Sequence, residues 1–128
     1  DLCLQVCEGT PRLYIFRARD RDLTFTEITY HEKVTQCLFG IGDHPWYLAV
    51  AKPTHSIENF PTQSDIEVFQ IHEKLIVRLN AGVWHAGPLF CGVDHMDFLN
   101  LELSDTNTTD HNTHSYVPDR FMFSVRPP

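Results

Sequence analysis

The sequence has little positive charge, no long apolar run and no recognisable cysteine motif. Ten lysines and arginines face seventeen aspartates and glutamates, and the net charge of −7 opposes attraction to nucleic-acid phosphates or anionic lipids. No apolar run approaches the roughly 20 residues that span a bilayer, and the N-terminus lacks a basic and then apolar signal segment. We therefore expect neither nucleic acid nor a membrane as a partner, and we expect a cytoplasmic location.

The cysteines and the chain length set further limits. Cys3, Cys7, Cys37 and Cys91 match neither a zinc ribbon nor a Cys-x-x-Cys redox pair, so we interpret them as reduced thiols without a chemical role. A chain of 128 residues suits one domain, residues 1–128, with its own core. The chain begins with Asp1 rather than Met, which leaves open that N-terminal residues are missing from a processed or truncated product.

Short segments with an apolar residue at every second position fill most of the sequence. Leu23, Phe25, Thr29 and His31, for example, share one face of an extended segment. No window keeps an apolar period of 3.6 residues for three turns, and Gly and Pro separate the segments. The pattern predicts an all-β domain, either a sandwich or a jelly-roll barrel. The expected strands are residues 13–18, 23–30, 36–40, 46–52, 66–71, 74–79, 89–92, 97–104 and 120–125, with turns at 40–45, 80–82 and 86–88 and loops at 53–64 and 104–118.

Two segments about fifty residues apart carry the residues best suited to chemistry. Thr29 and His31 point the same way on one strand, and Gln36 on the next strand can fold back toward them. His85 follows Trp84 just before small turn-forming residues, so its imidazole can be aimed into a barrel. The spacing predicts that His31, Gln36 and His85 surround one small-molecule site. The alternative is that both histidines are hydrogen-bonded, half-buried structural residues.

Three motifs, Thr-x-His-x4-Gln, Gly-x-Trp-His and Met-Asp-Phe-Leu-Asn-Leu-Glu, occur in this order along the chain. In this combination the sequence resembles the ureidoglycolate lyase family of cupins, in which a His followed five residues later by Gln precedes a Val-Trp-His motif and an Asp-Phe strand. Here these elements are His31 with Gln36, residues 83–85, and Asp97 with Phe98. The resemblance covers roughly residues 11–115 and is closest to plant-type members, on the segments 34–38, 46–53, 84–90 and 100–107.

The resemblance implies a cupin fold, or double-stranded β-helix, and the splitting of ureidoglycolate into glyoxylate and urea, a reaction of purine catabolism. General cupins hold a divalent metal with a His-x-His pair, a Glu and a distant His, whereas Thr29 and Gln36 replace the first His and the Glu here. The set His31, Gln36 and His85 would form a weaker site for zinc, manganese or iron, and metal dependence stays open. Bacterial members also end the Asp-Phe strand with an Asp-Arg pair, where this chain has Leu-Glu at residues 101–102.

The implied reaction assigns roles to these residues. Breakdown of ureidoglycolate removes the hydroxyl proton, protonates the departing nitrogen and requires the carboxylate to be held. We expect His85 to accept the proton, His31 to orient or polarise the hydroxyl, and Gln36 to fix it by hydrogen bonds. The substrate-binding candidates are Lys52 for the carboxylate, with Arg78 as its alternative, and Trp84, Asn100 and Glu102 as further cavity residues.

Other interpretations stay open. His111 and His114 would chelate a metal only if their loop were helical or folded over the barrel mouth. A diverged cupin enzyme, such as an isomerase, cyclase or lyase on another small metabolite, and a non-catalytic ligand-binding cupin are the alternatives to a ureidoglycolate lyase. Edge strands of a jelly roll also favour pairing between subunits, so we expect a homodimer.

Overall fold

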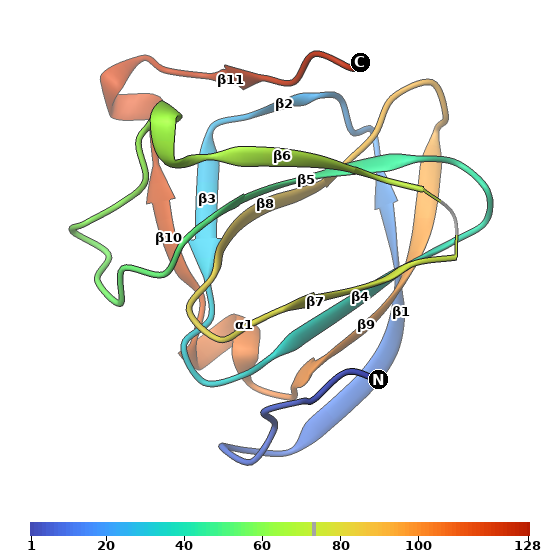
Figure 1. The fold of residues 1–128 in the computed structure, drawn as a ribbon, viewed down its shortest axis with the longest axis vertical. Coiled ribbons are helices and arrows are strands. Elements are labelled where there is room, and N and C mark those ends of the chain that lie inside the picture. The colour runs from blue at the N-terminus through green and yellow to red at the C-terminus, as the bar shows by residue number, and fades with distance from the viewer. Residues whose placement is uncertain (73) are drawn as a thin grey trace.

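The computed structural model describes residues 1–72 and 74–128, and its strands form two main antiparallel sheets (Figure 1). The four-stranded sheet has the order β1-β9-β4-β7, the five-stranded sheet has the order β10-β3-β8-β5-β6, and β11 pairs with β2. The strands are β1 (Pro11–Arg19), β2 (Thr24–Phe25), β3 (Glu27–Tyr30), β4 (Gln36–Ile41), β5 (Trp46–Ala51), β6 (Glu67–Ile71), β7 (Ile76–Leu79), β8 (Trp84–Leu89), β9 (His95–Leu103), β10 (Asn112–Ser115) and β11 (Phe123–Ser124).

Successive strands pass between the two sheets, which closes them into a jelly-roll barrel. β3 and β5 belong to the five-stranded sheet, whereas β4, between them in sequence, pairs with β7 and β9 in the other sheet. Figure 1 shows β5, β6 and β8 on one side of the barrel and β4, β7 and β9 on the other. The prediction of an all-β cupin fold is therefore confirmed.

The predicted turn at residues 86–88, followed by a new strand, is wrong. β8 continues through Gly87 and Pro88 to its end. Gly87 has a φ of 129°, a conformation that glycine adopts at low cost, and the pairing of β8 with β5 shifts register between Tyr47 and Ala49. A bulge of this kind lets a strand accommodate a Gly-Pro step without ending.

The predicted loop at residues 104–118 is also partly wrong. It contains the helical turn α1 (Thr106–Thr109), the strand β10 and the 3-10 turn η2 (Val117–Asp119). β10 pairs along β3, and the Thr29 and Thr113 hydroxyls lie 2.7 Å apart across this pair. The polar composition of β10 suits an edge strand, because such a strand has no second neighbour to bury it. The other predicted loop holds the 3-10 turn η1 (Gln63–Asp65), and the predicted strand at 120–125 shrinks to β11.

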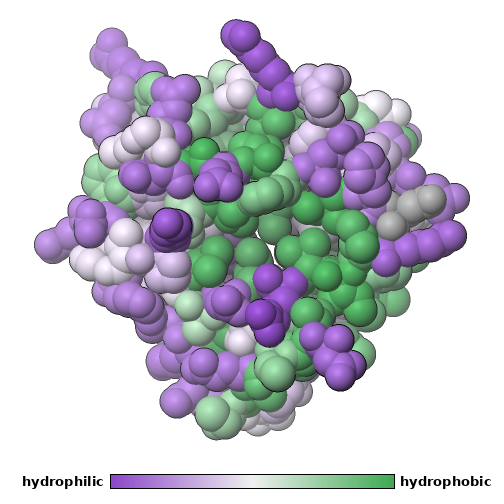
Figure 2. Space-filling model, in the orientation of Figure 1, coloured by the Kyte–Doolittle hydropathy of each residue, from purple (hydrophilic) through white to green (hydrophobic). Residues whose placement is uncertain are grey.

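Apolar side chains pack on both faces of the five-stranded sheet. On β5, Trp46 and Leu48 join the cluster between the two sheets, whereas Tyr47 and Ala49 join a second cluster on the outer face. In the barrel interior, the Trp46 and Phe98 rings meet edge to face with their centroids 5.1 Å apart. Figure 2 shows hydrophobic side chains toward the middle of the view and hydrophilic ones around its edge. The cluster between the two sheets makes the barrel interior mostly apolar, so polar groups inside it require an explanation.

The outer face of the four-stranded sheet carries exposed apolar side chains. Leu13 and Ile15 on β1 are 63% and 62% exposed, and Ile76 on β7 is 59% exposed. Leu2, Leu4 and Phe39 border a shallow groove on this face. Within the described residues, none of the helices has the length and hydropathy needed to cross a membrane.

Candidate active site

His31, Gln36 and His85 lie together inside the barrel. His31 follows β3, Gln36 begins β4, and His85 is on β8, where it pairs with Thr29. The three residues are 6%, 9% and 8% exposed, and the two imidazole centroids are 5.1 Å apart. All three border one narrow space that is too small for a water molecule. The structure therefore brings the three residues together around a space that has no room for a ligand.

A backbone carbonyl sets the tautomer of His31. Its Nδ1 lies 2.7 Å from the carbonyl oxygen of Asp110, and because a carbonyl only accepts hydrogen bonds, Nδ1 must carry the proton. Nε2 is then left with a lone pair. The Asp110 carboxylate accepts hydrogen bonds from the backbone N–H groups of Glu32, at 2.8 Å, and Lys33, at 2.9 Å. The residue that orients the imidazole is thus itself tied to the chain just after His31.

His85 is held in the same tautomer and is neutral at physiological pH. Its Nδ1 lies 3.2 Å from the carbonyl oxygen of Val83, so its Nε2 also carries a lone pair. Burial and then the neighbouring His31 lower the pKa of His85 from 6.5 to about 4. Burial also lowers the pKa of His31, although the Asp110 carbonyl opposes this shift. The site therefore presents two uncharged imidazoles that can each accept a proton or a hydrogen bond.

A network of hydrogen bonds extends from Gln36 along the inner face of the four-stranded sheet. Gln36 Nε2 donates to Asn100 Oδ1 at 3.0 Å, and Asn100 Nδ2 donates to Tyr14 Oη at 2.9 Å. Tyr14 Oη in turn donates to Glu102 Oε1 at 2.7 Å, and Arg12 Nη2 donates to the same oxygen at 2.6 Å. Asn100 and Glu102 are 2% and 1% exposed. Asn100 bonds directly to Gln36 and Glu102 ends the network, and neither residue lines the cavity that reaches His85.

That cavity, of about 350 Å³, opens beside His85. It is also lined by His111, from the segment between α1 and β10, whose ring centroid is 5.7 Å from that of His31. A volume of this size lies at the small end of the range for ligand pockets, roughly 300–1,000 Å³. The other polar residues of the lining are Arg21, Thr24, Thr26, Glu27 and Thr29.

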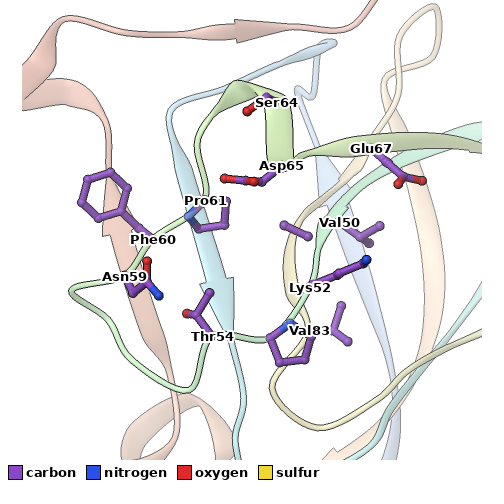
Figure 3. A pocket seen from close by; sticks show the side chains of 12 residues that line it. Val50, Lys52, Thr54, Asn59, Phe60, Pro61, Ser64, Asp65, Glu67 and Val83 are labelled. Atoms are coloured by element: carbon purple, nitrogen blue, oxygen red, sulfur yellow. The ribbon is translucent and has the colours of Figure 1, made fainter.

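Like Asn100 and Glu102, the other two predicted substrate-binding residues lie away from this cavity. Trp84 is on the opposite face of β8 from His85, where its ring packs edge-on to Tyr30 with centroids 4.5 Å apart, as strand alternation requires. Lys52 borders a separate cavity of about 670 Å³ (Figure 3). Val83 borders both that cavity and the narrow space between the histidines. The structure therefore does not bring Lys52 or Trp84 to the cavity beside His85.

Comparison with known proteins identifies the family. The ureidoglycolate lyase family model matches residues 2–123. The chain belongs to the ureidoglycolate lyase family. No curated protein matches it. The matched range includes both histidine segments and all of β9, so the resemblance drawn from the sequence motifs is confirmed at the level of the family. Similarity to the plant-type members in particular stays a prediction.

The donor set of this ureidoglycolate lyase family member fits a divalent metal only in part. Gln36 Oε1 is buried without a hydrogen-bond partner, and His31 and His85, which border the same narrow space, each leave Nε2 unprotonated. Three neutral acceptors suit either a cation or the N–H and O–H groups of a ligand. No group of three or more His, Cys, Asp or Glu side chains in residues 1–72 and 74–128 is placed to hold a metal. A bound cation would thus keep most of its charge uncompensated.

Asp110 and Arg21 were not predicted from the sequence as residues of this site, and His111 was considered only as a metal-chelating pair with His114. The loop after β9 does fold against the barrel, but the His111 and His114 rings separate, so they do not form a chelating pair. His114 stacks on Phe60 with centroids 3.5 Å apart, whereas His111 lies beside His31. A pattern along the chain could not reveal these contacts, because Asp110 and His31 are 79 residues apart.

Proposed function

We propose that the protein cleaves ureidoglycolate into glyoxylate and urea by acid-base chemistry. The observation that carries this proposal is the pair of neutral imidazoles, His31 and His85, of which His85 borders a cavity sized for a small metabolite. Membership of the ureidoglycolate lyase family supports the same reaction class. A base must be unprotonated at working pH. The lowered pKa of His85 ensures this, although a pKa of about 4 also makes the imidazole a weaker base than one that titrates near pH 7.

The proton path needs one histidine. His85 Nε2 takes the proton of the substrate hydroxyl, the oxygen forms a carbonyl, and the carbon–nitrogen bond breaks with its electron pair moving to the urea nitrogen. The protonated His85 then returns its proton to that nitrogen, which releases glyoxylate and urea and restores the neutral imidazole. Because burial disfavours the charged imidazole, protonated His85 is a strong acid in this second step.

In this proposal His31 and Gln36 take no part in the proton transfer. Both border the narrow space beside His85. Because this space is too small for a water molecule, they would meet a substrate hydroxyl or ureido N–H group only where binding widens it. When bound, a divalent metal would supply polarisation of a substrate oxygen, and His31, Gln36 and His85 are the residues that would hold it. However, the single unprotonated nitrogen of His85 cannot bind a metal and accept the proton at once.

Urea release by purified, EDTA-treated protein tests the proposal directly. We expect the wild type to release urea and glyoxylate in equal amounts from ureidoglycolate. His85→Gln should lower kcat by roughly 10²- to 10⁴-fold, the usual contribution of a positioned acid-base group. His95→Gln is the matched control, because His95 is exposed at the start of β9. Failure of the wild type to release urea, or a normal rate for His85→Gln, would contradict the proposal.

A metal-dependent cupin enzyme with another small substrate is the second candidate. The observation that favours it is the buried, unsatisfied Gln36 Oε1 beside two neutral imidazoles, because such acceptors are costly to bury without a partner. In that case EDTA would abolish activity, and zinc, manganese or iron would restore it. Retained ligand affinity without turnover under either condition would instead indicate a non-catalytic cupin.

A further inference from the structure

None of the basic residues named so far is placed to bind a substrate carboxylate in the cavity beside His85. Lys52 lies at the separate cavity of Figure 3. Arg78 is exposed on β7, where its Nη1 donates to the carbonyl oxygen of Cys3 at 3.1 Å. Arg12 is bound to the buried Glu102. None of these three side chains borders the cavity beside His85.

Arg21 is the cation that does border this cavity, together with His85 and His111. It comes from the segment between β1 and β2, and it makes no ion pair with any residue in the described part of the chain. A guanidinium group presents two parallel N–H donors that match the two oxygens of a carboxylate. Arg21 is therefore available to an anionic ligand at the point where that ligand would also reach His85.

We propose that Arg21 binds the carboxylate of a small hydroxy acid in the cavity beside His85 and so determines its selectivity for anions. The assignment rests on the proposed function for the identity of the acid, but the carboxylate-binding role can be measured separately. With the carboxylate held at Arg21, the hydroxyl-bearing carbon next to it lies in the cavity that the imidazoles line. His85 and His111 are the two imidazoles on the cavity wall.

Hydrogen bonds on both sides of Arg21 hold its segment in place. The Asp20 backbone N–H donates to the Asp94 carbonyl oxygen at 3.2 Å. Asp22 Oδ1 accepts hydrogen bonds from the Thr24 backbone N–H at 2.9 Å and from the Thr24 hydroxyl at 2.6 Å. An Asp side chain that bonds to the backbone two residues on forms a compact turn. The backbone on either side of Arg21 is therefore anchored, although its side chain is exposed.

The charges around the cavity make Arg21 necessary for anion binding. The ionisable groups of its lining are Arg21, Glu27, His85 and His111, and the whole chain carries a net charge of −7. Without Arg21, an incoming carboxylate would meet Glu27 and an overall negative field, both of which repel it. Removal of Glu27 should have the opposite effect and strengthen binding of an anion.

The test uses the full chain and glycolate as the probe, with the uncharged glycolamide as its matched analogue. Binding is followed by NMR titration of the imidazole signals. Arg21→Ala should weaken glycolate binding roughly 10- to 100-fold, the range for a lost hydrogen bond to a charged group, and should leave glycolamide binding unchanged. Arg21→Lys should recover part of the affinity, and Glu27→Gln should increase it. Arg19→Ala is the control, because Arg19 is exposed at the end of β1 and does not line the cavity.

Kinetics distinguish this inference from the proposed function. If the wild type releases urea, Arg21→Ala should raise KM for ureidoglycolate by the same factor and change kcat much less, because the carboxylate is not the reacting group. If the wild type releases no urea but binds glycolate through Arg21, the proposed function fails and the carboxylate site stands. If the wild type does not bind glycolate, or Arg21→Ala binds it as tightly as Arg19→Ala does, the inference is overturned.

Discussion

The neutral state of His85 predicts a loss of stability in mild acid. Its imidazole is 8% exposed, and its pKa falls from 6.5 to about 4 on folding. Because the folded-state pKa is depressed, the unfolded chain binds a proton more readily than the folded protein between these two values. The contribution of His85 to stability is therefore complete above pH 6.5 and is lost progressively as the pH falls toward 4.

The size of this loss follows from the two pKa values. At pH 5 the unfolded histidine is almost fully protonated, whereas the folded one is still mostly neutral. The free energy of unfolding should accordingly drop by about 2 kcal/mol between pH 7.5 and pH 5 from His85 alone. A domain is typically stable by only about 5–15 kcal/mol, so the change is large enough to measure. His31, whose pKa is also lowered by burial, adds to it in the same direction.

Urea unfolding of the metal-free protein at pH 7.5 and pH 5 measures this loss. EDTA treatment is needed because a bound metal would hold His85 unprotonated for a different reason. His85→Gln removes the titrating group, so its stability should fall by about 2 kcal/mol less than that of the wild type over this range. His95→Gln, at an exposed position on β9, should behave like the wild type. Equal losses for the wild type and His85→Gln would refute the argument that His85 is buried in its neutral form.

Three further outcomes follow from the fold and the site. Gln36→Glu should raise the affinity for zinc, measured by calorimetric titration, because it adds a carboxylate to two imidazoles; an unchanged affinity would contradict this ligand geometry. Glu102→Ala should lower the free energy of unfolding by about 1–3 kcal/mol, because Arg12 and Tyr14 lose a buried acceptor, whereas Glu67→Ala at an exposed position should change it little. The homodimer stays a prediction, and we expect it to form through the exposed apolar face of the four-stranded sheet. Leu13→Glu, at a side chain 63% exposed on that face, should then yield a monomer in light scattering, and Val117→Glu, 58% exposed elsewhere, should not.

The face of a strand on which a residue lies could be predicted from the sequence. The period of two put Thr29 and His31 on one face, and the structure has Thr29 paired with His85. Asn100 and Glu102, which were predicted as cavity residues, lie two positions apart on β9, and both are buried inside the barrel. This success has a simple cause, because the side of a strand that a residue occupies is fixed by local geometry.

Contacts between distant loops could not be predicted in this way. The Asp110 carbonyl that orients His31 and the position of His111 depend on how the segment after β9 folds back over the barrel. Gly87 and Pro88 were interpreted as a turn because their backbone preferences favour one, but the neighbouring strand supplies a bulge that accommodates them. The loop contacts have no local signal along the sequence, and at Gly87 and Pro88 tertiary packing overrides the local signal.

The two backbone carbonyls restrict the chemistry of the site more tightly than the histidines do by themselves. Because the Asp110 and Val83 carbonyls each fix a proton on Nδ1, both Nε2 atoms are acceptors, and neither can donate a proton until its imidazole has first been protonated. A reaction that begins with a histidine acting as an acid is therefore disfavoured, whereas one that begins with proton abstraction from a hydroxyl is favoured. Between the two bases, His85 is the one that borders the open cavity, since His31 meets only the narrow space. The proposed cleavage of a hydroxy acid by His85, with the carboxylate held at Arg21, is consistent with this geometry.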